Sequence, residues 1–114
     1  KVEPMKHPEE VILNNTLRAL QAAVGGLIEI VNLEDDVHLL CNEEGKLIGL
    51  EPQIVVLKED DSRVLDVVVG NCIFASHNDE GETIGLTDKQ IEVIKEELKL
   101  EVFLGIQPVR ALFI

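Results

Sequence analysis

Two stretches of the chain carry apolar residues at helical spacing. In the first, Leu17, Leu20 and Val24 follow one another at i, i+3 and i+7, and polar residues suited to an N-cap precede them. This pattern predicts a helix over Asn15–Val24. The glycine pair that starts at Gly25 then ends the helix, because glycine readily takes the left-handed conformation of a helix C-terminus.

The second helical stretch begins at Thr87, which forms a capping-box sequence with Gln90. Apolar residues then fall on one face and charged residues on the other, which predicts a helix over Asp88–Leu98.

Dense apolar runs separated by turn residues predict strands between the two helices. The run Leu27–Leu33 is too dense for strict alternation, which favours a central strand covered on both faces. Val37–Cys41 follows an acidic turn and predicts the return strand of a hairpin. After a second turn over Asn42–Lys46, Leu47 and Ile48 start the next strand, which extends the pattern into a meander.

Two later runs also predict strands. Ile54–Leu57 is short, and Val64–Ala75 is the longest strand candidate in the chain. Gly70 lies in the middle of the longer run, where a bulge or a bend of a strongly curved sheet is the ordinary explanation.

The N-terminal region predicts a first hairpin. Val2–Pro4 and the apolar segment Glu9–Leu13 would form its two strands, and the stretch from Pro4 to Pro8 is turn-like. The sequence starts at Lys1 rather than Met, which is consistent with a trimmed start that removed part of this first strand.

Together these elements predict one α+β domain over residues 1–100: a curved, mainly antiparallel sheet of about five to seven strands, with both helices packed on it. Residues 101–114 form an apolar tail that would aggregate if it were exposed. Either the tail adds to the sheet, with Pro108 restricting it to an edge or a break, or it contacts another copy of the chain.

Charge narrows the classes of partner. The chain has 22 acidic residues against 10 Lys and Arg, a formal charge of −12, which disfavours direct contact with nucleic acid or an anionic membrane. Only three Phe and no Trp or Tyr are present, so stacking platforms for single-stranded bases are scarce. The acidic balance indicates either a solvated surface or attraction to a basic partner protein.

Cys41 and Cys72 each lie in an apolar run, where a thiol usually acts as a small buried hydrophobe with a raised pKa. We expect structural thiols rather than nucleophiles. The sequence shows no targeting peptide and no apolar run long enough to span a membrane, which predicts a cytoplasmic protein with reduced thiols.

No metal or cofactor site is predicted. His38 and Cys41 are three residues apart on a strand and therefore face opposite sides, while His7 and His77 read as solvated loop residues. The acidic turns lack the order of carboxylates and glycine found in an EF-hand loop. Gly25 and its neighbour follow a helix, so they lack the helix N-terminus of a phosphate-binding loop. No catalytic residues are assigned.

Several ordered motifs resemble a domain-of-unknown-function family from phages, prophages and conjugative elements of Gram-positive bacteria. They are TLRALQAAVGGLIEIVNLEDD, CNEEGKLIGLEP, the late apolar run and LTDKQIE, and the resemblance covers nearly all of Val2–Leu98. The sequence departs from the family pattern at Ile48, where Asn is usual, and at Glu51 and Gln53, where Pro and Asn are common. The resemblance implies an association with mobile elements and no particular activity.

These observations favour a small acidic accessory protein of a mobile element that binds a host or element protein, with a decoy that imitates the charge of DNA as a special case. Self-association through the tail is a further hypothesis. The alternative is a small enzyme or small-molecule binder with a site between the first helix and the 42–52 loop. In either case we expect any binding residues at Asn42, Glu43, Glu44 and Lys46, the polar residues that the fold does not obviously require.

Overall fold

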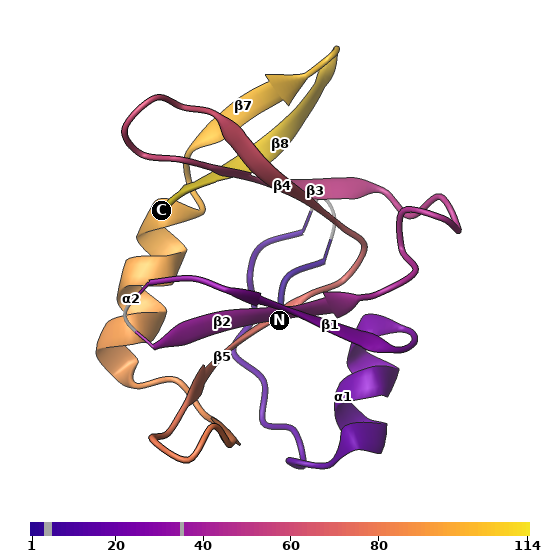
Figure 1. Ribbon diagram of the computed structural model, residues 1–114, viewed down its shortest axis with the longest axis vertical. Helices are drawn as coiled ribbons and strands as arrows, with labels where there is room; N and C mark the ends of the chain where they lie inside the picture. Colours follow the sequence, from indigo (N-terminus) through magenta and orange to yellow (C-terminus); the bar gives the residue numbers. More distant parts are fainter. Residues whose placement is uncertain (4–5, 35) are drawn as a thin grey trace.

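Two four-stranded β-sheets packed against each other form the body of the protein (Figure 1). The computed structural model describes residues 1–3, 6–34 and 36–114. In chain order the elements are α1 (Leu17–Val24), β1 (Ile28–Asn32), β2 (Val37–Asn42), β3 (Pro52–Leu57), β4 (Val64–Val69), β5 (Ile73–His77), β6 (Thr83–Ile84), α2 (Asp88–Glu97), β7 (Glu101–Leu104) and β8 (Gln107–Phe113).

The first sheet has the order β1-β2-β5-β6 and is antiparallel throughout. The second has the order β4-β3-β8-β7, with one parallel pair, β3 and β8. The predicted α+β class is therefore confirmed, whereas the single sheet of about five to seven strands is replaced by two sheets.

Gly70 explains why one predicted strand became two. Its φ is +72°, and a Cβ at this position would lie 2.6 Å from Cδ1 of Leu50, so a larger side chain would require both backbone strain and repacking. The chain turns here from β4 of the second sheet to β5 of the first. The predicted single strand over Val64–Ala75 is therefore wrong, because the glycine marks a corner between sheets and not a bulge within one.

The main core lies between the two sheets. Leu39 of β2, Ile54 of β3 and Cys72 just before β5 are fully buried there. Helix α2 closes one side of this core with Ile94 and Leu98. Helix α1 packs on the other face of the first sheet, where its Val24 contacts a smaller cluster around Leu40 and Ile73.

β2, and not β1, is the covered central strand of the first sheet. Every residue of β2 is buried, whereas β1 lies at the edge and exposes Ile30. The prediction for Leu27–Leu33 is wrong because the density of apolar residues does not identify which strand has two neighbours. Leu47 and Ile48 also start no strand: they lie in a turn with exposed side chains, and the chain crosses to the second sheet instead of extending a meander.

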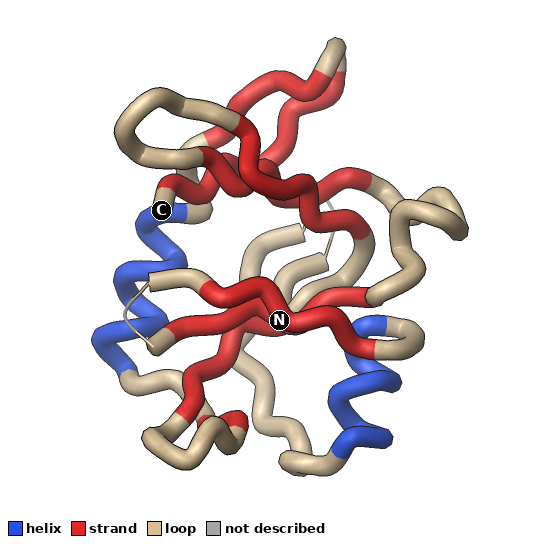
Figure 2. Tube along the Cα trace, in the orientation of Figure 1, coloured by secondary structure: helices blue, strands red, loops and turns tan. Residues whose placement is uncertain are grey.

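The predicted first hairpin is reduced to one reciprocal pair of bonds. The Glu9 N–H donates to the Lys1 carbonyl at 2.9 Å, and the Lys1 ammonium donates to the Glu9 carbonyl at 2.8 Å. Val2 forms a bridge with Cys72, and Glu9–Leu13 belongs to no strand. Part of the predicted turn, residues 4 and 5, lies outside the described residues. Figure 2 shows the chain from residue 6 onward as loop up to α1.

Both predicted helices are confirmed, together with their caps. Thr16 accepts the Ala19 N–H at the start of α1, and Gly25 ends that helix with φ of +82°. Thr87 and Gln90 form both bonds of the capping box at α2. Neither helix in the described part of the chain is long and apolar enough to cross a membrane.

The apolar tail forms the hairpin β7–β8 of the second sheet. β7 lies at the edge, while β8 is inserted between β7 and β3. Pro108 lies opposite Phe103 of β7, and the pairing of β8 with β3 begins only at Arg110. The missing N–H of Pro108 therefore interrupts no pairing between β8 and β3. The tip of the hairpin leaves Phe103 and Ile106 exposed. A contact of this tip with another copy of the chain stays a prediction.

Candidate functional site

Asn42, the first of the predicted binding residues, has a structural role. Its Nδ2 donates to the Val24 carbonyl at the end of α1 at 3.4 Å, and its Oδ1 accepts the Glu44 N–H at 2.9 Å. A Cβ on Gly26 would lie 2.9 Å from the same amide. The buried Asn42 side chain therefore joins the C-terminus of α1 to the turn that follows β2.

The other three predicted binding residues are exposed on that turn. Glu43 and Glu44 face solvent, and Lys46 forms an ion pair with Asp66 of β4 at 3.0 Å. Its hydrogen bond to Asp66 raises the pKa of Lys46. The structure thus brings Asn42 and Glu44 together but directs Lys46 to another strand. A binding role for these residues stays a prediction.

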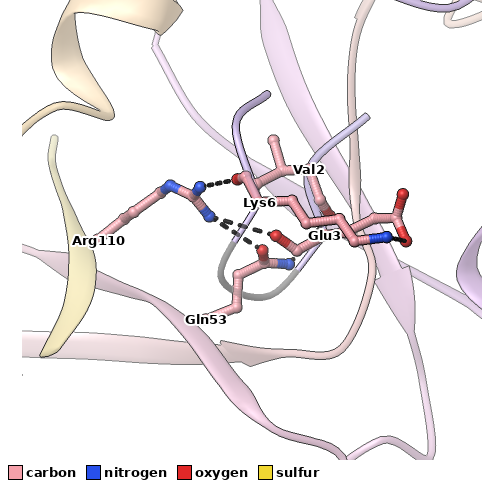
Figure 3. Close-up of polar contacts among 5 residues, drawn as sticks. All are labelled: Val2, Glu3, Lys6, Gln53 and Arg110. Carbon is pink, nitrogen blue, oxygen red and sulfur yellow. Dashed lines mark hydrogen bonds and ion pairs between the residues drawn. The ribbon is translucent and has the colours of Figure 1, made fainter. Parts of the chain in front are cut away.

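A polar cluster centred on Gln53 fastens the N-terminal segment to the sheets (Figure 3). Gln53 is only 3% exposed, and its Nε2 donates to the Val2 carbonyl at 3.1 Å and to the Gly70 carbonyl. Its amide therefore bonds both the first residues of the chain and the corner between β4 and β5.

Arg110 of β8 completes this cluster. Its guanidinium donates to Oε1 of Gln53 at 3.2 Å, to the Glu3 carbonyl at 3.5 Å, and to the Lys6 carbonyl (Figure 3). The planar guanidinium can serve several acceptors at once. The two side chains therefore hold both ends of the segment from Glu3 to Lys6 against the second sheet.

The two thiols are buried, as the sequence predicts. Burial raises the pKa of Cys41 to about 11 and that of Cys72 to about 12. At neutral pH almost none of either thiol is ionised, and the thiolate is the reactive form. Cys41 and Cys72 are therefore packing residues.

His38 and His77 form a stacked pair with ring centroids 5.5 Å apart. His77 ends β5 instead of lying in a solvated loop, and its Nε2 is 3.6 Å from an Asp36 carboxylate oxygen. His38 is 4% exposed, and its Nε2 bonds no described residue. Burial, and secondarily His77, lowers the pKa of His38. Across the described residues, no three His, Cys, Asp or Glu side chains gather as a metal site.

One side of the molecule collects acidic segments that are far apart in the sequence. The β1–β2 turn, the β3–β4 turn and α2 lie on this side, together with the C-terminus (Figure 1). A cavity of about 400 Å³ lies between Glu34, α2 and Ile114, and the Glu59 N–H donates to the Ile114 carbonyl at 2.8 Å. We call this the acidic side; its exposed carboxylates include Glu34, Asp36, Glu59, Asp60, Asp61, Asp88 and Glu92.

A second, larger hollow of about 590 Å³ runs beside β5. The loop from Pro8 to Asn15 forms one wall, and α2 contributes Ile91 and Ile94. Its lining is mainly apolar, and it has the volume of a typical ligand pocket. We call it the β5-edge groove. Residues 42–52, the region of the predicted small-molecule site, line neither this groove nor the cavity on the acidic side.

One sequence signal falls on the β5-edge groove. Val11 to Leu13 forms part of its wall, and the apolar pattern there predicts a strand that the structure does not form.

The family of domains of unknown function called DUF3846 matches residues 1–99, so the chain belongs to this family. No match was found among curated proteins or among solved structures.

Proposed function

For this DUF3846 protein we propose a non-enzymatic role: it binds a basic partner protein through its acidic side. The observation that carries the proposal is the gathering of three acidic segments on one side of the molecule, two of which line a cavity there, in a chain with a formal charge of −12 (Figure 1). Such a surface raises the local concentration of positively charged partners and orients them as they approach.

The cavity on the acidic side offers a place for a cationic side chain. Its walls combine two carboxylates, Glu34 and Glu97, and one cation, Lys89, with apolar residues such as Leu33 and Val93. A lysine or arginine can lay its aliphatic stem along apolar walls while its charge meets carboxylates. An arginine or lysine at the centre of the partner's interface fits this arrangement.

The resemblance to proteins of phages and conjugative elements supports a host or element protein as the partner. A DNA-binding protein is the special case, because carboxylates spread over turns and a helix can substitute for phosphates. In that case, binding of this chain would compete with DNA.

Two double variants with the same change of charge test the proposal. Glu34→Gln with Asp60→Asn removes two negative charges from the acidic side, whereas Glu43→Gln with Glu44→Gln removes two from the turn after β2, away from α2 (Figure 1). In a pull-down experiment with the full chain as bait, the captured proteins are compared at about 0.05 M and about 0.5 M salt. The electrostatic screening length differs by roughly threefold between these two concentrations.

We expect the chain to capture a basic protein at low salt and to lose it at high salt. Glu34→Gln with Asp60→Asn should weaken this capture at least about tenfold, and the other double variant should not. Capture that survives high salt, or that fails only in the variant of the turn after β2, would overturn the proposal. The second result would instead support the site predicted at Glu43 and Glu44.

A further inference from the structure

The hydrogen bonds between β1 and β2 show which main-chain groups of β1 face outward. At the two ends of this ladder, the Leu33 N–H donates to the Val37 carbonyl at 2.9 Å and the Glu43 N–H donates to the Leu27 carbonyl at 2.8 Å. Successive residues of a strand direct their N–H and C=O groups to alternate edges. The odd-numbered residues of β1 therefore bond β2, and the even-numbered residues direct these groups to the outer edge.

Three residues of β1 present main-chain groups on this outer edge: Ile28, Ile30 and Asn32. No described residue bonds their N–H or C=O groups there, because β1 ends the strand order of the first sheet. Ile30 is 53% exposed and Asn32 is exposed, so the edge is open to solvent. An exposed strand edge is a template for another extended chain.

An acidic side chain accompanies this edge on the face that is turned toward the second sheet. Glu29 lies there because it is opposite Cys41, a residue of the main core. Glu29 is exposed and forms no ion pair with a described residue. Lys46, on the turn after β2, donates to Asp66 at 3.0 Å instead. The Glu29 carboxylate therefore remains available to a cation on a strand that pairs with β1.

We propose that the outer edge of β1 binds an extended basic segment of a partner protein as a fifth, antiparallel strand of the first sheet, with a lysine or arginine opposite Glu29. The orientation follows that of the sheet, which is antiparallel throughout. Main-chain bonds to β1 supply the affinity, as in other cases of strand addition, and Glu29 supplies the selectivity.

This inference rests on the proposed function in that the partner is a basic protein. β1 leads into the β1–β2 turn of the acidic side, so one partner can contact both surfaces (Figure 1).

Charge complementarity selects a basic segment over a second copy of this chain. The stretch that contains β1, residues 27–36, has no Lys or Arg, so the β1 edge of a second copy brings no cation to Glu29. Two copies that each carry a formal charge of −12 also repel one another. A charge on an edge strand discourages indiscriminate pairing. Glu29 thus disfavours acidic and wholly apolar strands and leaves a cationic one as the fitting occupant.

The two faces of β1 determine the other side chains of the segment. Ile28 packs on the cluster beneath α1, and Ile30 lies opposite Leu40 of the same cluster, so the residues opposite these two are apolar. Val31 packs against the main core, which also favours an apolar residue opposite it. The five positions along β1 span about 17 Å at roughly 3.4 Å per residue.

The probe is a peptide with blocked ends, Ser-Thr-Val-Ile-Lys-Val-Ser, whose Ile lies opposite Ile30 and whose Lys lies opposite Glu29. Its affinity for the full chain is measured by NMR titration. N-methylation of the peptide's Ile removes a donor to Ile30, and we expect binding to weaken about tenfold. N-methylation of its Lys alters an N–H that points away from β1, so the loss stays within about threefold. Equal losses, or no binding of the parent peptide, would overturn the proposal.

An exchange of charges tests the pairing with Glu29. A second peptide carries Glu in place of Lys, and we expect the natural chain to bind it at least about threefold more weakly. Glu29→Lys should reverse this preference. Glu80→Lys makes the same change of net charge in the loop between β5 and β6, and should leave the preference as it is. A preference that responds equally to both substitutions would reflect net charge alone and would overturn the pairing.

Amide hydrogen exchange tests the open edge without substitution. In the free chain we expect the Ile30 amide to exchange at least about tenfold faster than those of Glu29 and Val31, and to slow when the Lys peptide binds. An Ile30 amide that is already as protected as its neighbours would overturn the proposal. Failure here is distinct from failure of the proposed function: peptide binding that is absent, with capture still lost in Glu34→Gln with Asp60→Asn, rejects the β1 edge alone.

Discussion

The turn after β2 and the acidic side differ in how far the fold accounts for their polar groups. In the turn, the polar groups of Asn42 and Lys46 have partners within the protein, at Val24, Glu44 and Asp66. On the acidic side, the exposed carboxylates of Glu34, Glu59 and Asp60 form no ion pair with a described residue. Polar residues that stand out in a sequence can thus be structural, while carboxylates without an internal partner lie on a different surface.

The largest effect is expected at Gln53, which holds Val2 at one end of the β5-edge groove. Gln53→Ala removes an amide that donates to the Val2 and Gly70 carbonyls and whose oxygen accepts one of the hydrogen bonds of the Arg110 guanidinium. We expect a loss of about 3 kcal/mol in the free energy of unfolding, measured in urea. Gln107→Ala removes a half-exposed amide that bonds only Glu51, at 3.4 Å, and should cost less than about 0.5 kcal/mol. Similar losses for the two variants would contradict the structural role of Gln53.

Asn42→Ala tests the turn after β2 directly. The variant loses a buried bond to the end of α1 and a cap on the turn, so we expect about 2 kcal/mol of destabilisation with unchanged binding of the basic partner. Glu43→Ala, on the same turn, should leave stability unchanged. A variant of Asn42 that kept its stability but lost partner binding would restore the predicted site.

The pH dependence of stability tests the buried histidine. The pKa of His38 is lowered in the folded chain, so the unfolded chain binds the proton first. The stability associated with neutral His38 is therefore present above about pH 6.5 and declines as the pH falls toward the lowered folded value. We expect the free energy of unfolding to fall between about pH 7 and pH 5 more steeply in the natural chain than in His38→Gln. Identical slopes would show that His38 titrates normally.

The smallest effect is expected for the exposed ion pair of Lys46. Its side chain is 63% exposed, and such pairs contribute little because solvent screens them. Lys46→Ala should cost no more than about 0.5 kcal/mol, and that cost should disappear at high salt. A larger, salt-insensitive cost would indicate that the turn after β2 is held by more than Asn42.

Local patterns predicted the helices and their caps because each depends on residues that are neighbours in sequence. Thr87 and Gln90 define the start of α2 by themselves. The predictions that failed depended on residues that are distant in the sequence. One was which strand, β1 or β2, has a neighbour on both sides. The other was whether Gly70 bends one strand or separates two strands. The acidic composition was visible in the sequence, whereas its gathering on one side required the fold.

The β5-edge groove could not be predicted for a related reason. The apolar segment Val11–Leu13 has the composition of a strand, and only the structure shows that it stays apart from β5.

Capture of a basic protein by the two double variants at about 0.05 M salt is the most direct test of the acidic side. We expect at least about tenfold weaker capture by Glu34→Gln with Asp60→Asn, and unchanged capture by Glu43→Gln with Glu44→Gln. Equal capture by both double variants would contradict binding through the acidic side.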